Sequence, residues 1–284
     1  MKILENVDLA DYSSFKIGGK AKVMYIPESV EELIQLTKNN ESKLPLLGNG
    51  SNILINDKKV FENVVLVNKF NNRLENLGNG FFIIGASVKL SKAIKFVNEN
   101  NYGGLENLYM VPGLIGGALV SNAGNSKLKG DFIGNYIVKV KVLIDNQVRE
   151  LSKEECKFGF RDSIFKKSKN IVILEAMFKF DEMTIEQIES RKKDKLTNVR
   201  KHQKLSIPSL GSIFSQANGK ILRIVRLFFY PFHRKGVRFS NTNPSWLCNY
   251  GKGTFKQTVR IINTVIFLHK ICFQKISIEI DIWE

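Results

Sequence analysis

Two glycines bracket an asparagine where one apolar run ends and another begins, in the stretch Gly48-Asn49-Gly50-Ser51-Asn52. Glycine tolerates positive φ, so successive backbone N–H groups in such a loop can converge on an anion. The side chains of Asn49, Ser51 and Asn52 add hydrogen-bonding groups. The pattern therefore indicates a phosphate or pyrophosphate cradle. A polar hairpin turn is the alternative, because Asn-Gly is a strong hairpin signal.

A second run of small residues follows about sixty positions later, from Val111-Pro112-Gly113 through Gly116-Gly117-Ala118 to Ser121–Asn125. Small residues let the backbone approach a ligand or another element closely. A tight helix-packing turn would need the same composition. Two such loops in one chain favour a ligand more strongly than either does alone.

Four further side chains could carry chemistry. Arg161 follows Phe160, and such an arginine can equally be a surface cation–π or ion-pair residue. Ser212 follows a glycine, so its hydroxyl could project from the start of a strand into a site. Neither a G-x-S-x-G elbow nor a nearby histidine supports a serine-hydrolase triad. Glu279 and Asp281 share the polar face of an expected alternating strand over 276–282, where most carboxylates are simply solvated.

Alternating helix and strand signals predict the elements that position these residues. A turn and strand over 11–26 lead to a helix after Pro27, with Ser29 as N-cap and Glu32 completing a capping box. The cradle then follows the second strand of a β-α-β unit. Further elements are expected as strands at 63–67, 81–85, 137–144 and 171–180, helices from 90 to about 102 and over 253–274, and a basic helix or linker over 184–204.

Bulk composition is that of an ordinary soluble protein of two or three domains. Its three cysteines are odd in number and widely spaced, which argues for a reducing compartment without disulfides or zinc knuckles. The net charge of +16 suits a small polyanionic substrate or a nucleic acid, although no RNA-binding, zinc-finger or helix-turn-helix motif accompanies it. Met1–Asn6 lacks a signal-peptide pattern, and the apolar segment 261–273 is too short and too polar to span a membrane. We expect a cytoplasmic protein without a membrane partner.

Taken in order, five motifs resemble the UDP-N-acetylenolpyruvoylglucosamine reductase family. They are Ser14-Phe15-Lys16-Ile17-Gly18-Gly19, Gly48–Asn52, Val111-Pro112-Gly113 with Asn122-Ala123-Gly124, Phe160–Lys166 and Pro208–Phe214. The resemblance implies an α+β fold with a two-subdomain FAD-binding region of the PCMH or vanillyl-alcohol-oxidase type and a smaller α+β substrate-binding domain. It divides the chain at 1–65, 66–185 and 195–284. The absence of the family's longer tyrosine-bearing insert marks the compact type.

The resemblance implies FAD held non-covalently and NADPH as reductant. It assigns Gly48, Asn49, Gly50, Ser51, Asn52, Pro112, Gly113, Gly117 and Gly124 to the cofactor. In the implied reaction, flavin N5 delivers hydride to the vinyl C3 of the enolpyruvyl ether, and the product is the UDP-N-acetylmuramate of peptidoglycan synthesis. Ser212 is then the proton donor to C2 and Arg161 stabilises the enolate. Asp281 occupies the position of the family's catalytic glutamate, one methylene shorter.

The departures from the family gather after Ser212, where Ser215-Gln216-Ala217 replaces the usual basic residue and proline. The resemblance still implies substrate contacts at Lys204, Gln216 and Asn243. The altered last domain leaves open a related FAD oxidoreductase acting on another acidic substrate, and the charge alone leaves open a basic nucleic-acid-binding protein. No metal, no nucleic acid and a monomer are expected.

Overall fold

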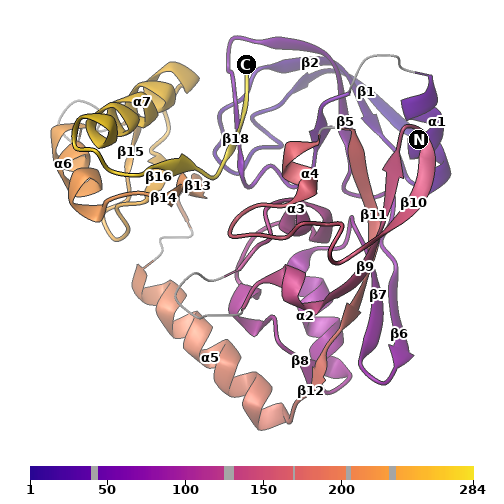
Figure 1. The fold of residues 1–284 in the computed structure, drawn as a ribbon. Coiled ribbons are helices and arrows are strands. Elements are labelled where there is room, and N and C mark those ends of the chain that lie inside the picture. Colours follow the sequence, from indigo (N-terminus) through magenta and orange to yellow (C-terminus); the bar gives the residue numbers. More distant parts are fainter. Residues whose placement is uncertain (40–43, 125–130, 169, 203–205, 230–234) are drawn as a thin grey trace. The chain divides into compact units, whose positions relative to one another are not determined.

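The computed structural model describes residues 1–39, 44–124, 131–168, 170–202, 206–229 and 235–284 (Figure 1). The chain forms two compact units, each assembled from separate segments of sequence. The first comprises Met1–Leu4, Met24–Asn49 and Asn63–Val199, and the second comprises Glu5–Val23, Gly50–Glu62 and Arg200–Glu284.

Three strands of one sheet contribute residues to both units: β1 (Lys2–Asp8), β2 (Lys20–Ile26) and β5 (Val60–Leu66). With β3 (Leu46–Leu47) they form a sheet of order β1-β2-β5-β3, in which β3 is parallel to β5. The helix α1 (Val30–Lys38) connects β2 to β3. This is the predicted β-α-β arrangement, and the cradle follows β3 as expected.

The predicted cap of α1 is confirmed in modified form. The Ser29 hydroxyl accepts the Glu32 N–H at 3.2 Å. The Glu32 carboxylate, however, accepts the N–H of Glu28 at 2.8 Å. This hydrogen bond is the main reason that the pKa of Glu32 lies below its ordinary value.

An antiparallel sheet of order β10-β9-β11-β7-β6 forms the centre of the first unit. Its strands are β6 (Leu74–Gly78), β7 (Phe81–Gly85), β9 (Ile137–Ile144), β10 (Gln147–Ser152) and β11 (Ile171–Lys179). The helices α2 (Leu90–Glu99) and α3 (Ile115–Val120) share one apolar core with the buried side of this sheet. Short elements complete the unit: β8 (Tyr102–Gly103), η1 (Glu106–Leu108), η2 (Ile133–Tyr136), α4 (Ile164–Lys167) and β12 (Asp181–Glu182). Most of the long helix α5 (Ile185–His202) also belongs to it.

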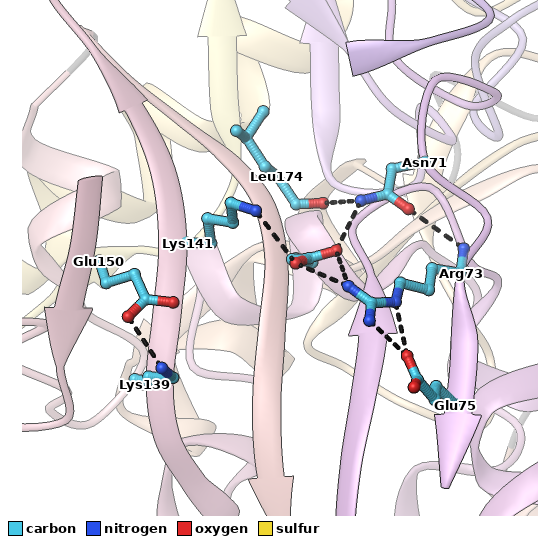
Figure 2. Close-up of polar contacts among 8 residues, drawn as sticks. Asn71, Arg73, Glu75, Lys139, Lys141, Glu150 and Leu174 are labelled. Atoms are coloured by element: carbon cyan, nitrogen blue, oxygen red, sulfur yellow. Dashed lines mark hydrogen bonds and ion pairs between the residues drawn. The ribbon is translucent and has the colours of Figure 1, made fainter. Parts of the chain in front are cut away.

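The other side of that sheet is polar, and its charges are paired (Figure 2). Glu175 on β11 accepts the side-chain amide of Asn71 at 3.2 Å, and Arg73 lies 3.2 Å and Lys141 3.6 Å from the same carboxylate. Lys141 faces Glu175 directly across the β9–β11 register. These cations are already engaged within the sheet, so we assign them a structural role.

The second unit contains a sheet of order β13-β16-β15 covered by two helices (Figure 1). Its elements are β4 (Ile53–Ile55), β13 (Ser209–Ser212), β14 (Phe214–Gln216), α6 (Gly219–Phe229), β15 (Val237–Phe239), β16 (Trp246–Asn249), α7 (Phe255–Ile271), β17 (Ser277–Ile278) and β18 (Asp281–Trp283). Leu222 and Val225 of α6 share an apolar core with Ile261, Ile262 and Val265 of α7.

The single terminal strand predicted over 276–282 is wrong. Strand β17 pairs antiparallel with β14, whereas β18 pairs parallel with β4, and a bend at Ile280 separates them. Because Glu279 and Ile280 are both buried, the alternation breaks there. Glu279 is thus buried while Asp281 is exposed, and the two carboxylates do not share one polar face.

Candidate active site

The loop Gly48–Asn52 is not a hairpin turn, because the strands on its two sides pair with different partners. Strand β3 pairs with β5, and β4 pairs with β18, both in parallel. This excludes the alternative that the Asn-Gly sequence left open. The loop passes from the first unit to the second at Asn49–Gly50.

Gly50 is required by the fold itself. Its φ is +60°, and a Cβ there would lie 1.9 Å from the carbonyl oxygen of Tyr12. The Ser14 N–H donates to the Gly50 carbonyl at 2.9 Å. The motif Ser14–Gly19 therefore fixes the backbone of the loop.

The loop leaves hydrogen-bond donors for a ligand. Among the residues that the structure describes, the backbone N–H groups of Asn49, Gly50 and Asn52 meet no protein acceptor. Asn49 is exposed. Backbone N–H groups left open in a short loop suit a phosphate or pyrophosphate group.

The second small-residue segment is held by backbone hydrogen bonds. Leu90 N–H donates to the Gly113 carbonyl at 3.0 Å, and Ile115 N–H donates to the Val88 carbonyl at 2.9 Å. A Cβ added at Gly117 would meet no atom within 4 Å, and one at Gly48 would meet only Leu114 Cδ1, at 3.7 Å. Both glycines thus border open space. The absence of a side chain at each position leaves room for a bound group.

Two other residues assigned to the cofactor differ from Gly117. Gly124 is buried, and a Cβ there would lie 2.2 Å from the Phe132 ring, so close packing already explains this glycine. Pro112 is exposed.

A buried acceptor at the carboxyl end of β5 was missed by the sequence reasoning. The Asn68 Oδ1 atom is buried and has no hydrogen-bond partner within the described segments. Asn68 follows β5 closely, and β5 is parallel to β3, which leads into Gly48. Ligands of α/β sheets commonly bind at this edge. A hydroxyl of the cofactor is a suitable donor to Asn68. The only sequence signal was an asparagine just after a buried strand.

These observations fit FAD. Its pyrophosphate matches the open N–H groups of the Gly48–Asn52 loop, and its hydroxyl groups match Asn68. The surfaces of Gly48 and Gly117 leave room for it. The structure identifies no cluster of three or more His, Cys, Asp or Glu residues suited to a metal among the residues searched.

The Arg161 backbone has φ of +54°, an uncommon conformation for a residue with a side chain. Two side chains hold the turn in place. Asn122 Nδ2 donates to the Gly159 carbonyl at 2.7 Å, and Ser163 Oγ donates to the Val120 carbonyl at 2.7 Å. The arginine is thereby fixed against the end of the second small-residue segment. Strained backbone held by its surroundings is typical of functional sites.

A second cation lies close enough to Arg161 to interact with it. Burial lowers the pKa of Lys195 on α5, and the Arg161 guanidinium lowers it further. Burial and a nearby like charge both disfavour the charged form of Lys195. The basic pattern of 184–204 gave a signal for a helix here but did not single out Lys195.

Ser212 is the last residue of β13, not the first residue of a strand as expected. Gly211 before it has φ of +68°, and the register between β13 and β16 shifts between Ser209 and Ser212. Bulges of this kind redirect a side chain out of the normal alternation. The half-buried Ser212 hydroxyl is thus presented by a distorted strand end.

Backbone hydrogen bonds in the second unit gather the serine, the terminal carboxylates and the cradle. Glu279 N–H donates to the Ile213 carbonyl at 2.8 Å, and Asp281 N–H donates to the Asn52 carbonyl at 3.0 Å. Asn52 Nδ2 also donates to the Glu279 carbonyl at 3.4 Å. Ser212, Asn52, Glu279 and Asp281 therefore belong to one connected framework, while Arg161 lies in the first unit.

The Asp281 carboxylate is engaged by its own strand. It accepts the Ile282 N–H and the Trp283 indole N–H, each at 3.1 Å. The Trp283 ring lies against Phe61 with a centroid separation of 5.5 Å. Trp283 is a positioning residue that sequence reasoning also missed, although its spacing from Asp281 placed both on one side of a strand.

The predicted substrate contacts have different settings. Gln216 ends β14 and is exposed. The Asn243 side-chain oxygen accepts the Ser245 N–H at 3.0 Å and closes a local turn. Lys204 lies outside the described residues.

The histidine His269 has a structural role. It is fully buried, and its Nε2 accepts the Asn218 N–H at 2.7 Å. Its Nδ1 therefore carries the proton and donates to the Val265 carbonyl, also at 2.7 Å. Nε2 thus anchors the start of α6, and Nδ1 holds the ring on its own helix α7.

Comparisons with known proteins agree with this geometry. A family profile described as an FAD binding domain matches residues 21–147. Together with the α+β fold and the open cradle, this match defines an FAD-binding flavoprotein.

More specific similarity extends along the whole chain. A UDP-N-acetylenolpyruvoylglucosamine reductase of Fusobacterium nucleatum is 31% identical, over 99% of this chain and 98% of its own length. The enzyme of the same name from Thermotoga maritima is 30% identical, over 96% of this chain and 94% of its own. The crystal structure of the Thermus caldophilus reductase, MurB, covers 100% of both chains with a TM-score of 0.82 at 24% identity, which supports the fold. The chain belongs to the UDP-N-acetylenolpyruvoylglucosamine reductase family, and it is an FAD-dependent oxidoreductase.

Proposed function

We propose that this protein reduces the enolpyruvyl group of UDP-N-acetylenolpyruvoylglucosamine to give UDP-N-acetylmuramate for peptidoglycan synthesis, with NADPH as reductant. One observation carries the proposal: a loop with open backbone N–H groups occurs in a chain that aligns along its whole length with reductases of this name. We further propose that residues 195–284 bind the substrate, and that the protein is a cytoplasmic monomer.

FAD held by the Gly48–Asn52 loop would supply the redox chemistry, which is hydride transfer from NADPH to the vinyl C3 of the substrate. The chain's own residues then manage charge and protons. Arg161 stabilises the negative charge that develops on the substrate enolate and carboxylate, and preorganised donors of this kind contribute about 3–4 kcal/mol. Lys195 adds to the positive potential around Arg161. Ser212 gives a proton to C2. Asp281, whose carboxylate accepts the Trp283 indole N–H, is the third catalytic residue.

The assignment is tested first by the colour and activity of the purified protein. A folded sample should show flavin absorbance, and NADPH oxidation should accelerate when UDP-N-acetylenolpyruvoylglucosamine is added. A colourless folded protein that does not take up FAD contradicts the flavoenzyme assignment. Flavin reduction by NADPH without any response to the substrate would instead favour a related oxidoreductase acting on another acidic compound.

Replacing Ser212 with alanine separates the two half-reactions. We expect Ser212→Ala to leave flavin reduction by NADPH unchanged and to slow reoxidation by the enolpyruvyl substrate by about 10²–10⁴-fold, the usual contribution of a general acid. Stopped-flow absorbance measures each step separately.

Ser209→Ala is the matched control, since Ser209 lies on the same strand and is also half-buried. It should react at nearly the wild-type rate in both steps. Equal slowing of both half-reactions in Ser212→Ala would exclude a proton-donor role.

A further inference from the structure

Helix α6 carries apolar side chains on its solvent side as well as on its buried side. Ile224, Leu227 and Phe228 are 61%, 72% and 66% exposed. Their i, i+3, i+4 spacing places them on one face of the helix. Leu222 and Val225 are buried in the core on the other side. A helix that is apolar on both faces usually has a partner on both.

The end of α7 is similarly apolar toward solvent. Phe267 is 60% exposed and Ile271, one turn later, is 56% exposed. Phe273, just past the helix, is 96% exposed. The two helices pack against each other within the second unit (Figure 1). We call these six side chains the apolar surface of α6 and α7.

Phe273 is both exposed and strained. The Gln274 N–H donates to the His269 carbonyl at 2.8 Å and the Phe273 N–H donates to the Lys270 carbonyl at 3.1 Å, which is the Schellman pattern of a helix end. Its left-handed position normally holds glycine, yet here Phe273 has φ of 52°. A large aromatic placed there and pointed at water costs stability without any gain from burial, which suggests that it serves a contact.

The stretch of sequence that carries this surface contains basic residues and no acidic ones. From Lys195 to Ile278 there are fifteen lysines and arginines and no aspartate or glutamate. Lys220 and Arg223 belong to α6, and Lys270 and Lys275 flank the end of α7. A partner must therefore combine negative charge with an apolar phase.

Charge and apolarity together select among the possible partners. A second copy of this surface would bring like charges together, and a nucleic acid offers no apolar phase for exposed Ile224 and Leu227. Exposed Phe, Ile and Leu side chains with Lys and Arg beside them are typical of helices that lie in a membrane interface. We propose that the apolar surface of α6 and α7 binds the surface of an anionic phospholipid membrane. The contact is peripheral, since no helix among the described residues is long and apolar enough to cross a bilayer.

This proposal replaces the expectation from sequence that no membrane takes part. In the proposed contact the apolar side chains enter the boundary between headgroups and acyl chains, and the cations lie among the phosphates. It is independent of the substrate of the flavin site.

Vesicle co-sedimentation of the full-length FAD-loaded protein tests the proposal. We expect binding to vesicles of phosphatidylcholine mixed with phosphatidylglycerol, and no binding to phosphatidylcholine alone. Removing charge by Arg223→Gln should weaken the binding roughly fivefold, as for one cation near an anionic surface. Failure to bind the anionic vesicles at low salt would overturn the proposal.

The apolar contribution is tested at constant charge. Ile224→Gln/Leu227→Gln should weaken vesicle binding roughly tenfold or more, since two aliphatic side chains that would enter the membrane interface are lost. The matched control is Val138→Thr/Val148→Thr, which removes two exposed apolar side chains (37% and 44% exposed) from the first unit and should bind like wild type. Equal binding of wild type and the α6 variant would leave only charge attraction and overturn the proposal that the apolar surface binds the membrane. Capture of an acidic protein instead, without vesicle binding, would do the same.

Phe273→Gly distinguishes lost contact from lost folding. Because glycine suits φ of 52°, this variant should have a higher thermal midpoint than wild type while binding the vesicles more weakly. A variant that gains stability and keeps full vesicle binding would show that Phe273 takes no part.

Discussion

Gly50 and Gly117 occur in two similar glycine-rich segments, yet they do different things. The space that a Cβ would need at Gly50 is filled by the Tyr12 carbonyl, whereas at Gly117 it is open. The sequence predicted an anion cradle or a turn in the first segment and close approach of a ligand or another element in the second, and at Gly117 that approach stays a prediction. It could not say what approaches each glycine, because Tyr12 reaches Gly50 only through the tertiary fold.

This difference makes Gly117→Ala informative. Gly117 lies in α3, so alanine should raise the stability of the flavin-free protein by about 0.5–1 kcal/mol through helix propensity. If its open side receives the cofactor, FAD affinity should fall at the same time. Thermal unfolding of the flavin-free protein and an FAD titration measure the two effects.

Gly219→Ala is the corresponding control. Gly219 also belongs to a helix and would also meet nothing within 4 Å. It should leave FAD affinity unchanged. Unaltered FAD affinity in Gly117→Ala would remove Gly117 from the cofactor site.

At the scale of elements, local signals succeeded where a short stretch determines its own structure. Ser29 caps α1 as predicted, and the strands at 81–85 and 137–144 agree residue for residue with β7 and β9. The terminal segment failed because its two halves pair with strands from distant parts of the chain, β14 and β4. Alternation in sequence does not reveal such a change of partner.

The turn that carries Arg161 likewise depends on a distant residue, Asn122. Its side chain donates to the Gly159 carbonyl and accepts the Gly134 N–H at 3.0 Å, and its own φ is +41°. We expect Asn122→Ala to lower the free energy of unfolding by about 2–4 kcal/mol, from unsatisfied buried groups and a left-handed alanine. Urea unfolding measures this loss.

Asn79→Ala isolates the backbone part of that effect. Asn79 has a similar φ of +50° but is exposed in the turn between β6 and β7. Its loss should be only about 1 kcal/mol. Equal losses in the two variants would mean that the hydrogen bonds of Asn122 add nothing.

At the scale of the whole molecule, the family resemblance predicted the fold class and the cofactor, and the comparisons confirm both. Composition and periodicity alone gave only a protein of mixed helices and strands. Each unit is built from segments far apart in sequence, and local patterns carry no information about such pairings. The predicted roles of Arg161, Ser212 and Asp281 stay predictions.

Two buried thiols make the free energy of unfolding depend on pH in the alkaline range. Burial raises the pKa of Cys156 to about 12 and that of Cys248 to about 11, from 9.0. The folded state therefore holds these protons more tightly, so the stability they provide is complete below about pH 9 and is lost as the pH rises toward the folded values. Each thiol contributes a slope of at most about 1.4 kcal/mol per pH unit in that window.

Cys156→Ala should accordingly show a flatter decline of the free energy of unfolding above about pH 9 than wild type. The exposed Cys272 offers the control, because Cys272→Ala should leave the slope unchanged. Urea unfolding at a series of alkaline pH values measures both. Parallel curves for wild type and Cys156→Ala would contradict the assignment.

The acid-free stretch from Lys195 to Ile278 has a consequence for handling the protein. With no carboxylate side chain to titrate, this stretch keeps its positive charge at every pH from neutral down through the acid range. Retention on a cation exchanger should thus persist through the acid range and fall strongly with salt, since the screening length shrinks from about 10 Å at 0.1 M to about 3 Å at 1 M. Ionic strength, rather than acidity, is the variable that would release this protein from any negatively charged surface.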